Sequence, residues 1–207
     1  MSICDRCSSF GLRFERQYAP QDFLEGDPNS KIWVIGLNPK QDVAWIDPRQ
    51  ISELRNYFHG DVKVHAYFER FRNVSEKLYS LFGRVEGAAH TDLVKCASSC
   101  WPPTKMSPRS KAEVISNCVS YLEQQIETYR PELIVCNGAE VSSEIRRFLQ
   151  PPSDTLGNAT SYVHTREDGS KVSVVLSGFI GRIDNYARRR LGIEIESLFP
   201  AEYRDRC

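Results

Sequence analysis

The segment Cys4-Asp-Arg-Cys7 brings two thiols close together near the start of the chain. The two-residue gap lets both thiolates reach one metal ion or one edge of a metal cluster. The chain contains seven cysteines, and in a reducing compartment cysteines more often bind metals or fill the core than form disulfides. Because one such pair is half of a four-thiol site, further ligands must come from the remaining cysteines: Cys96, Cys100, Cys118, Cys136 or Cys207.

A second candidate is Asn38, which lies in the segment Gly36-Leu-Asn-Pro39. The four apolar residues 32–35 precede it, and their β-branched composition is typical of a strand buried on both faces of a parallel sheet. Glycine and proline end the strand, so Asn38 lies near its carboxyl end, where open α/β sheets bind ligands. Its amide can position a water molecule, or it can hydrogen-bond its own loop as turn asparagines do.

Expected strands and helices alternate along the chain, and these elements must position the candidate residues. A capping box at Ser110 and Glu113 begins one helix, and Gly192 is expected to end the last one. Residues 161–166 and 171–177 either pair as a hairpin, or the second joins the main sheet. We predict helices over residues 50–59, 67–82, 110–129, 139–149 and 183–191, and further strands over 90–96 and 131–136.

This alternation predicts an α/β fold with three layers, in which a central, mostly parallel sheet lies between two helical layers. We expect a single domain over residues 1–207, with residues 1–30 as a cysteine-bearing arm packed on it. The 27 basic and 27 acidic residues cancel, so net charge does not indicate nucleic acid, although a local basic patch can exist. The sequence has neither a long apolar run nor a signal peptide, so we expect a cytoplasmic monomer that does not enter membranes.

In this order the motifs resemble the uracil-DNA glycosylase superfamily, and most closely its iron–sulfur branches. A Cys-x-x-Cys precedes a strand that ends in Gly-Leu-Asn-Pro, as in the water-activating loops of glycosylases. The segment Asp92-Leu-Val-Lys-Cys96 is similar to the family's Asn-Val-Val-Lys-Cys strand. The helix from Cys118 to Ile126 and the following Arg130-Pro-Glu-Leu-Ile are similar to the cluster-ligating helix and its next strand.

The resemblance implies an enzyme that hydrolyses the N-glycosidic bond of a damaged or deaminated base in DNA. It further implies a structural [4Fe–4S] cluster on Cys4, Cys7, Cys96 and Cys118. Zinc is the less favoured alternative, because four thiolates also bind zinc. Cys100 remains an alternative to Cys96, because the inserted segment Ala97-Ser-Ser-Cys100 separates Cys96 from the Trp101-Pro-Pro segment that follows.

The resemblance also assigns residues to the substrate. Gly36, Leu37 and Pro39 surround Asn38 in the loop that faces the substrate. Asp92 stands where the iron–sulfur branches commonly have an asparagine that reads the base. An aromatic residue such as Phe68 could stack on a flipped base, although its spacing equally suits the core of a helix.

One difference from the family lies after the last strand, where a histidine usually helps to stabilise the leaving base. Here the segment reads Leu176-Ser-Gly-Phe-Ile-Gly-Arg182. The Ser177 hydroxyl, or the backbone N–H groups of Gly178 and Phe179, could donate instead, with Arg182 contacting a phosphate. A protein of the same fold that binds nucleic acid or a nucleotide without cleaving it is the second interpretation. A zinc-stapled domain unrelated to DNA is the third.

Overall fold

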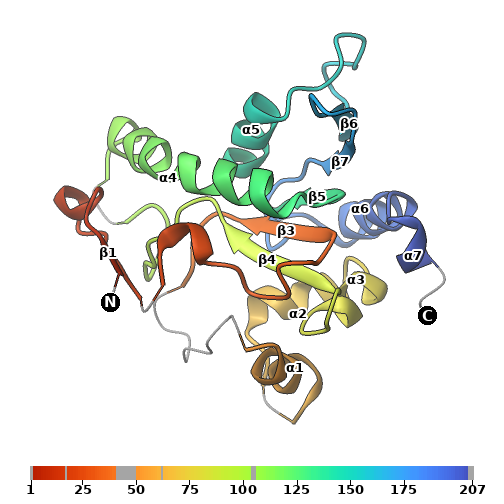
Figure 1. Cartoon of the computed structure of the whole chain (residues 1–207), viewed down its shortest axis with the longest axis horizontal. Helices are drawn as coiled ribbons and strands as arrows, with labels where there is room; N and C mark the ends of the chain where they lie inside the picture. The colour runs from red at the N-terminus through yellow and green to blue at the C-terminus, as the bar shows by residue number, and fades with distance from the viewer. Residues whose placement is uncertain (1, 17, 41–49, 62, 104–105, 205–207) are drawn as a thin grey trace.

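The computed structural model describes residues 2–16, 18–40, 50–61, 63–103 and 106–204 (Figure 1). Within these residues, strands and helices alternate along most of the chain. The strands are β1 Ser2–Cys4, β2 Phe14–Arg16, β3 Ile32–Gly36, β4 Ala88–Asp92, β5 Leu133–Cys136, β6 Ser161–Thr165 and β7 Lys171–Val175. The helices are α1 Ile51–His59, α2 Ala66–Arg72, α3 Glu76–Leu81, α4 Pro108–Tyr129, α5 Ala139–Phe148, α6 Asn185–Ser197 and α7 Ala201–Arg204.

Within the described residues, β3 to β7 form one five-stranded sheet in the order β4-β3-β5-β7-β6. The pairs β3–β4, β3–β5 and β5–β7 are parallel, and the edge strand β6 is antiparallel to β7. Both interpretations of the last two strands are therefore confirmed, because β7 forms a hairpin with β6 and also joins the main sheet. Strand β4 ends at Asp92 rather than at Cys96, so the expected strand over residues 90–96 was placed too late.

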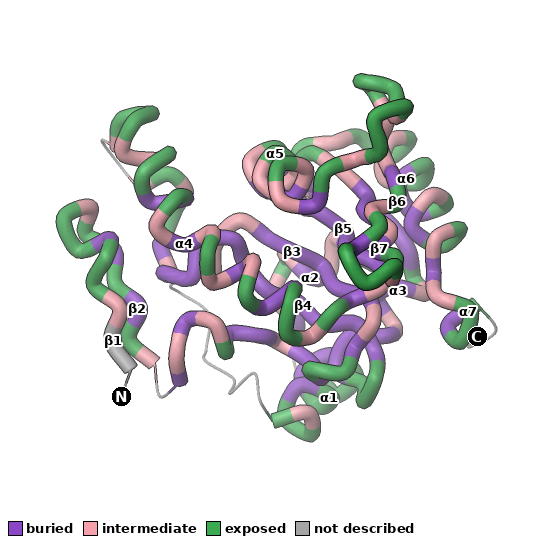
Figure 2. The backbone as a smooth tube through the Cα atoms, turned by 45° about the horizontal axis from the view of Figure 1, so that its top comes forward, coloured by how far each residue is buried: buried purple, intermediate pink, exposed green. Residues whose placement is uncertain are grey.

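The two faces of the sheet are covered by different helices, as the period-2 alternation along a strand requires. Trp33 and Ile35 face the core formed with α4 and α5, whereas Ile32 and Val34 face the core formed with α1, α2, α3, α6 and α7. All four side chains are fully buried, and buried backbone is concentrated in the central strands (Figure 2). The three-layer α/β/α prediction is confirmed.

The N-terminal arm packs on the α4 side of the sheet. Strands β1 and β2 pair antiparallel in a small separate sheet. The aromatic side chains of Phe14, Tyr18 and Phe23 are buried in the same core as α4 and α5. This packing brings the N-terminal cysteines next to α4.

Two predicted helices differ from the structure because of contacts between distant segments. The helix expected over residues 67–82 is broken into α2 and α3. Ser75 begins α3, since its hydroxyl oxygen accepts from Leu78 N at 2.9 Å. The same hydroxyl donates to Glu196 of α6 at 2.5 Å, a contact that no local pattern announces.

Gly192 does not end the last helix, because α6 continues to Ser197. The residue is buried where α6 crosses the segment before α3, and a Cβ at this position would overlap the backbone carbonyl oxygen of Val74. The glycine permits close helix packing rather than a stop. Helix α4 also begins earlier than predicted, at Pro108, with Ser107 rather than Ser110 as its N-cap.

A search of the described helices finds none that is both long and apolar enough to cross a membrane.

Candidate functional site

Four neighbouring strands, β4, β3, β5 and β7, have their carboxyl ends side by side, and these ends form one edge of the sheet that we call the carboxyl edge. Asp92 ends β4 opposite Gly36, which ends β3. Asn137 follows β5, and its backbone N–H donates to Ile35 O at 2.9 Å. Ser177 lies just after β7, where Gly138 N donates to its carbonyl at 3.2 Å. The sequence therefore predicted correctly that Asn38 lies near a strand end. Asp92 was expected inside a strand over residues 90–96 and instead ends β4, and β5 and β7 complete this end of the sheet.

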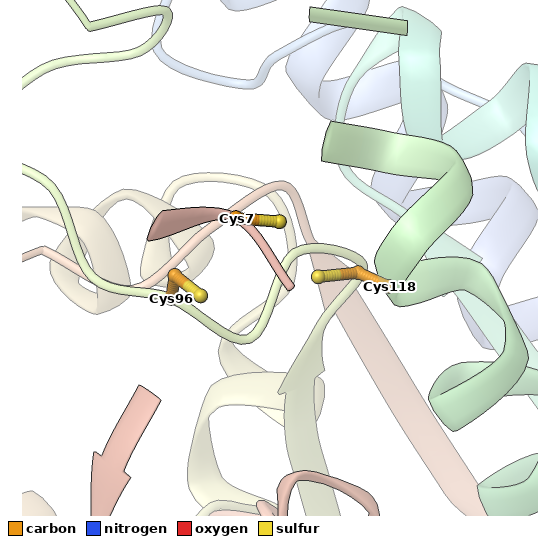
Figure 3. Close-up of side chains that lie close together, drawn as sticks. All are labelled: Cys7, Cys96 and Cys118. Atoms are coloured by element: carbon orange, nitrogen blue, oxygen red, sulfur yellow. The ribbon is translucent and has the colours of Figure 1, made fainter. Parts of the chain in front are cut away.

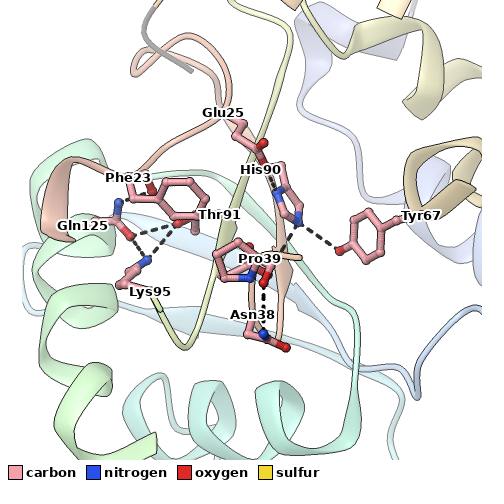
Figure 4. A network of polar contacts seen from close by, with 10 residues as sticks. Phe23, Glu25, Asn38, Pro39, Tyr67, His90, Thr91, Lys95 and Gln125 are labelled. Carbon is pink, nitrogen blue, oxygen red and sulfur yellow. Dashed lines mark hydrogen bonds and ion pairs between the residues drawn. The ribbon is translucent and has the colours of Figure 1, made fainter. Parts of the chain in front are cut away.

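Asn38 is half-buried in the loop after β3. Its Nδ2 donates to Pro39 O at 3.0 Å (Figure 4). The same nitrogen donates to Ser98 Oγ at 2.7 Å. Because the nitrogen is used locally, Oδ1 is the atom available as an acceptor for a ligand. Leu37 and Pro39 flank it and are also half-buried.

Asp92, the last residue of β4, is buried beneath the strand ends. Burial raises the pKa of its carboxyl to about 6, because the charged form is poorly solvated and His90 and Lys95 offset that penalty only in part. His90 Nε2 lies 4.0 Å from Asp92 Oδ1. The carboxyl group therefore titrates near neutral pH and can be a donor or an acceptor of hydrogen bonds.

His90 connects the sheet to the arm and to α2. Its Nδ1 lies 2.5 Å from Glu25 Oε2, and its Nε2 lies 2.9 Å from the Tyr67 hydroxyl (Figure 4). His90 and Glu25 also exchange two backbone hydrogen bonds of 2.7 and 2.8 Å. The imidazole is thus fixed at both nitrogens.

Phe68 lies behind the strand-end site rather than at its surface, with its ring packed edge-on against the imidazole of His90 at a centroid distance of 5.1 Å. Its ring is buried among other aromatic rings of the α1–α3 layer, with edge contacts to Phe58 and Phe82 at centroid distances of 5.0 and 5.5 Å. Tyr67 and Phe179 are instead half-buried at the edge, with ring centroids 6.5 Å apart and planes inclined by 19°. These two rings are the aromatic surface that the site offers.

The segment after β7 supplies different groups from those predicted. The Ser177 hydroxyl donates to the carbonyl oxygens of Cys136 and Gly178, at 2.7 and 2.8 Å, so it is engaged with the backbone. Gly178 and Arg182 are exposed, and the Arg182 backbone N–H donates to Phe179 O at 2.8 Å. Ser177 therefore shapes the loop, whereas the Arg182 guanidinium is accessible to a phosphate.

Three buried thiols meet on the face of the sheet that α4 covers. The sulfur atoms of Cys7, Cys96 and Cys118 lie within 4.8 Å of one another and point toward a common space (Figure 3). Hydrogen bonds from the Cys118 and Cys96 thiols lower the pKa of Cys7 to about 3. A thiolate held by two thiols is a donor set suited to a thiophilic metal.

The remaining cysteines lie outside this group. Cys4 Sγ is 3.5 Å from the Tyr121 hydroxyl, one helical turn along α4 from Cys118. Cys100 is exposed, so the structure places Cys96 rather than Cys100 beside the other thiols. Cys136 is buried in β5, and Cys207 lies outside the described residues.

A buried lysine lies between the strand ends and the thiols. Lys95 Nζ donates to Gln125 Oε1 at 2.6 Å and to Thr91 Oγ1 at 2.8 Å (Figure 4). Gln125 in turn donates to Phe23 O at 2.8 Å. This network ties β4 to α4 and to the arm next to Cys96.

Sequence reasoning missed Glu25, His90, Asn137 and the polar role of Tyr67. The signal for His90 was its place two residues before Asp92, because residues i and i+2 of a strand face the same side. Asn137 follows a buried strand in the same way as Asn38. A hollow of about 420 Å³ elsewhere on the surface, lined by Phe58, Arg72 and Tyr79 among others, contains none of these residues.

Comparisons with known proteins agree with this geometry. A model of the uracil DNA glycosylase superfamily matches residues 23–178, which include the strand-end residues from Gly36 to Gly178 as well as Cys96 and Cys118. The chain is also 28% identical over 116 residues to the Type-5 uracil-DNA glycosylase of Pyrobaculum aerophilum. That similarity covers 55% of this chain and 46% of the relative, so the chain spans about half the relative's length.

Proposed function

This chain belongs to the uracil DNA glycosylase superfamily, and we propose that it hydrolyses the N-glycosidic bond of a damaged or deaminated base in DNA. The observation that carries the proposal is the pairing of Asp92 with Gly36 at the carboxyl ends of β4 and β3, with Asn38 two residues further along the loop after β3. Asn38 lies where it can hold a water, and Asp92 lies where it can meet the edge of a base. The similarity to a Type-5 uracil-DNA glycosylase supports the same reaction class.

In this reaction the bond between C1′ of the sugar and the base nitrogen breaks, and its electron pair leaves with the base. A water oxygen forms the new bond to C1′ and leaves an abasic sugar. The water gives up one proton and the base takes up one, so the products are neutral. The target nucleotide must first leave the base stack, because C1′ is otherwise inaccessible.

Asn38 orients the attacking water through Oδ1. A neutral amide cannot remove a proton at working pH, so its contribution is alignment rather than general-base catalysis. The amide nitrogen is held by Ser98 and Pro39, which fixes the direction of Oδ1. Gly36 and Leu37 allow the loop to approach the substrate, and Arg182 binds a phosphate next to the lesion.

Asp92 sets the base preference. The amide of an asparagine offers both a donor and an acceptor, whereas an ionised carboxylate can only accept. Facing the O4 atom of uracil, an ionised Asp92 would leave two acceptors opposed, so plain uracil is a poor substrate at neutral pH. A base that presents an amino group there, or the protonated form of Asp92, removes the conflict.

For the metal, we propose that Cys7, Cys96 and Cys118 hold a structural [4Fe–4S] cluster with Cys4 as the fourth ligand. The three buried thiols and the all-sulfur donor set fit such a group. A tetrahedral zinc ion with Zn–S bonds of about 2.3 Å would keep its sulfurs about 3.8 Å apart. The three sulfurs lie within 4.8 Å of one another, so their spacing also suits zinc, and metal analysis must exclude it. Either group would tie the arm to β4 and α4.

A second candidate function is recognition of a nucleotide or DNA lesion without cleavage. It is favoured by one observation, the engagement of the Ser177 hydroxyl with backbone carbonyls in a segment that has no histidine.

A panel of oligonucleotides separates the two functions. Each carries one deaminated or damaged base, in single- and double-stranded form, and is scored for abasic sites after incubation with the protein. Abasic sites on at least one base support the enzyme. Tight binding without any abasic site supports the recognition module.

A further inference from the structure

Glu25, His90 and Tyr67 form a connected row beside the strand-end site. Both imidazole nitrogens of His90 face oxygen atoms, Glu25 Oε2 at 2.5 Å and the Tyr67 hydroxyl at 2.9 Å (Figure 4). The backbone bonds between Glu25 and His90 leave the carboxylate little freedom. The row therefore ends at one defined point, the phenolic oxygen.

That point lies over the last residue of β3. A Cβ added at Gly36 would overlap Asp92 Oδ1, and it would lie 2.8 Å from the Tyr67 hydroxyl and 2.9 Å from His90 Nε2. The glycine thus creates the space in which three polar atoms gather, two residues before Asn38. Any other residue would displace them.

Asn137 lies on the opposite side of Gly36. It is buried, and its Nδ2 has no hydrogen-bond partner among the described residues. Buried amide nitrogens without a partner are rare and need an explanation, such as a missing ligand. The amide lies beside the Tyr67 hydroxyl, and hydrogen bonding from Asn137 offsets part of the rise that burial causes in the Tyr67 pKa. The cluster over Gly36 thus includes one buried amide donor next to the phenolic oxygen.

The charges around this row favour a cationic His90 and a neutral Tyr67. Burial lowers the pKa of His90, but the carboxylates of Asp92 and Glu25 outweigh burial and the repulsion of Lys95, so the pKa is raised. Burial, together with the Asp92 charge, raises the pKa of Tyr67 well above its usual range. An imidazolium donates from both nitrogens, so Tyr67 accepts from His90 and its own O–H can donate elsewhere.

We propose that Tyr67 is a catalytic residue of the proposed glycosylase, which donates a hydrogen bond to the leaving base, and that His90, fixed by Glu25, is its positioning residue. The inference rests on the proposed function. As the C1′–N bond breaks, its electron pair moves onto the base, and a base oxygen accepts from Tyr67 without proton transfer. This supplies the stabilisation that the engaged Ser177 hydroxyl does not give.

The first test is Tyr67→Phe, which removes one hydroxyl and keeps the ring beside Phe179. Removing one such donor lowers catalytic rates by about 10²–10³-fold, so single-turnover base release should fall by that factor while affinity for the lesion DNA changes less than about twofold. Tyr79→Phe is the matched control, because that hydroxyl donates to Glu69 in the same helical layer. Its rate should equal that of the wild type.

The second test separates positioning from a structural role of His90. Above about pH 7 Asp92, with its pKa of about 6, is already ionised, so base release by the wild type should fall at higher pH as the imidazolium of His90 loses its proton. His90→Gln should be slower at pH 7 and flat over this range, and Glu25→Gln should move the fall to lower pH. The groups facing the imidazole are Glu25, Tyr67, Asp92 and Lys95.

The outcomes are distinguishable. If the wild type releases base and Tyr67→Phe does so equally fast, or if His90→Gln keeps the wild-type pH profile, this inference is overturned and the glycosylase stands. If the wild type releases no base from any oligonucleotide, the proposed function fails and Tyr67 has no catalytic role. If His90→Gln does not fold, Tyr67→Phe and Glu25→Gln decide the question.

Discussion

The base preference of the site depends on a single residue, Asp92, and on how its carboxyl group meets the edge of a base. The carboxyl is buried at the end of β4, and burial raises its pKa to about 6. Below that pH the protonated group offers a donor and an acceptor, as an asparagine does. Above it the ionised group only accepts. One titration therefore changes what the site can read.

We predict that Asp92→Asn excises uracil faster than the wild type at pH 7.5. Removing one opposed pair of acceptors is worth about 1–3 kcal/mol, which corresponds to roughly a 5- to 160-fold gain in rate. The ratio of the two rates should shrink below pH 6, where wild-type Asp92 is protonated. Single-turnover assays at several pH values measure this ratio. Efficient uracil excision that is unchanged in Asp92→Ala would contradict the prediction.

Among the helices and strands, the packing of α6 depends on the close approach of Gly192 to the backbone of Val74. Alanine is normally favoured over glycine inside a helix by about 1 kcal/mol. At position 192 the added Cβ would overlap the carbonyl oxygen of Val74, and backbone cannot move aside as a flexible side chain can. Overpacking of this kind costs about 1–3 kcal/mol or more, so it outweighs the propensity.

Gly192→Ala should therefore lower the free energy of unfolding, measured by urea denaturation at fixed pH. Ile193→Ala is the control on the next position of the same helix, where the side chain is 65% exposed and a change within about 0.5 kcal/mol is expected. Equal stability of the two variants would show that α6 does not pack on the segment before α3 as described.

The cluster of three thiols also depends on how elements pack, because its cysteines come from the arm, from the loop after β4 and from α4. Cys118→Ser should lose the bound metal, together with the broad absorption near 400 nm (roughly) that thiolate-ligated iron–sulfur clusters give. Cys136→Ser is the matched control, since that thiol is equally buried but lies outside the group.

Elemental analysis of anaerobically purified protein checks this prediction. Full metal content in Cys118→Ser would remove that residue from the site. Stoichiometric zinc in a colourless wild type would replace the cluster by the zinc alternative.

The elements could be predicted where a local pattern determines them. The apolar run of β3 and the glycine and proline after it located Asn38, and the hairpin turn before Lys171 located β7. The break before α3 and the length of α6 could not be predicted, because they depend on Ser75 meeting Glu196 and on Gly192 meeting Val74.

The site divides in the same way. Asn38 could be found because it follows a recognisable strand, whereas Asp92 was found through the resemblance of residues 92–96 to a family motif. Glu25, His90 and Tyr67 lie on three separate segments, and only the packing of the arm and of α2 against β4 joins them beside Gly36. Phe68 is buried in the aromatic core. Helical spacing alone could not show whether its ring belongs to the core or contacts a ligand.

At the scale of the whole molecule, binding to DNA must come from a local surface, because the 27 basic and 27 acidic residues cancel. Arg182 is exposed beside the strand ends, in the segment that follows β7. A guanidinium there can contact a phosphate flanking the flipped nucleotide.

Arg182→Ala should weaken DNA binding similarly for all sequences and reduce the dependence of log Kd on log salt by about 0.7–0.9, the change expected for one lost phosphate contact. Fluorescence anisotropy titrations between 50 and 200 mM salt (roughly) measure the slope. Arg84→Ala is the control, because Arg84 is exposed near the amino end of β4, at the opposite edge of the sheet. An unchanged slope in Arg182→Ala would move the DNA surface elsewhere.

The most direct test of the central claim compares wild type and Asn38→Ala on the same lesion-containing oligonucleotide, with binding and abasic-site formation measured side by side. Because Asn38 orients the water and contributes little to affinity, the variant should bind DNA nearly as tightly as the wild type and leave no abasic site. A wild type that binds the lesion but forms no abasic site on any base tested would contradict the account. So would an Asn38→Ala variant that cleaves at the wild-type rate.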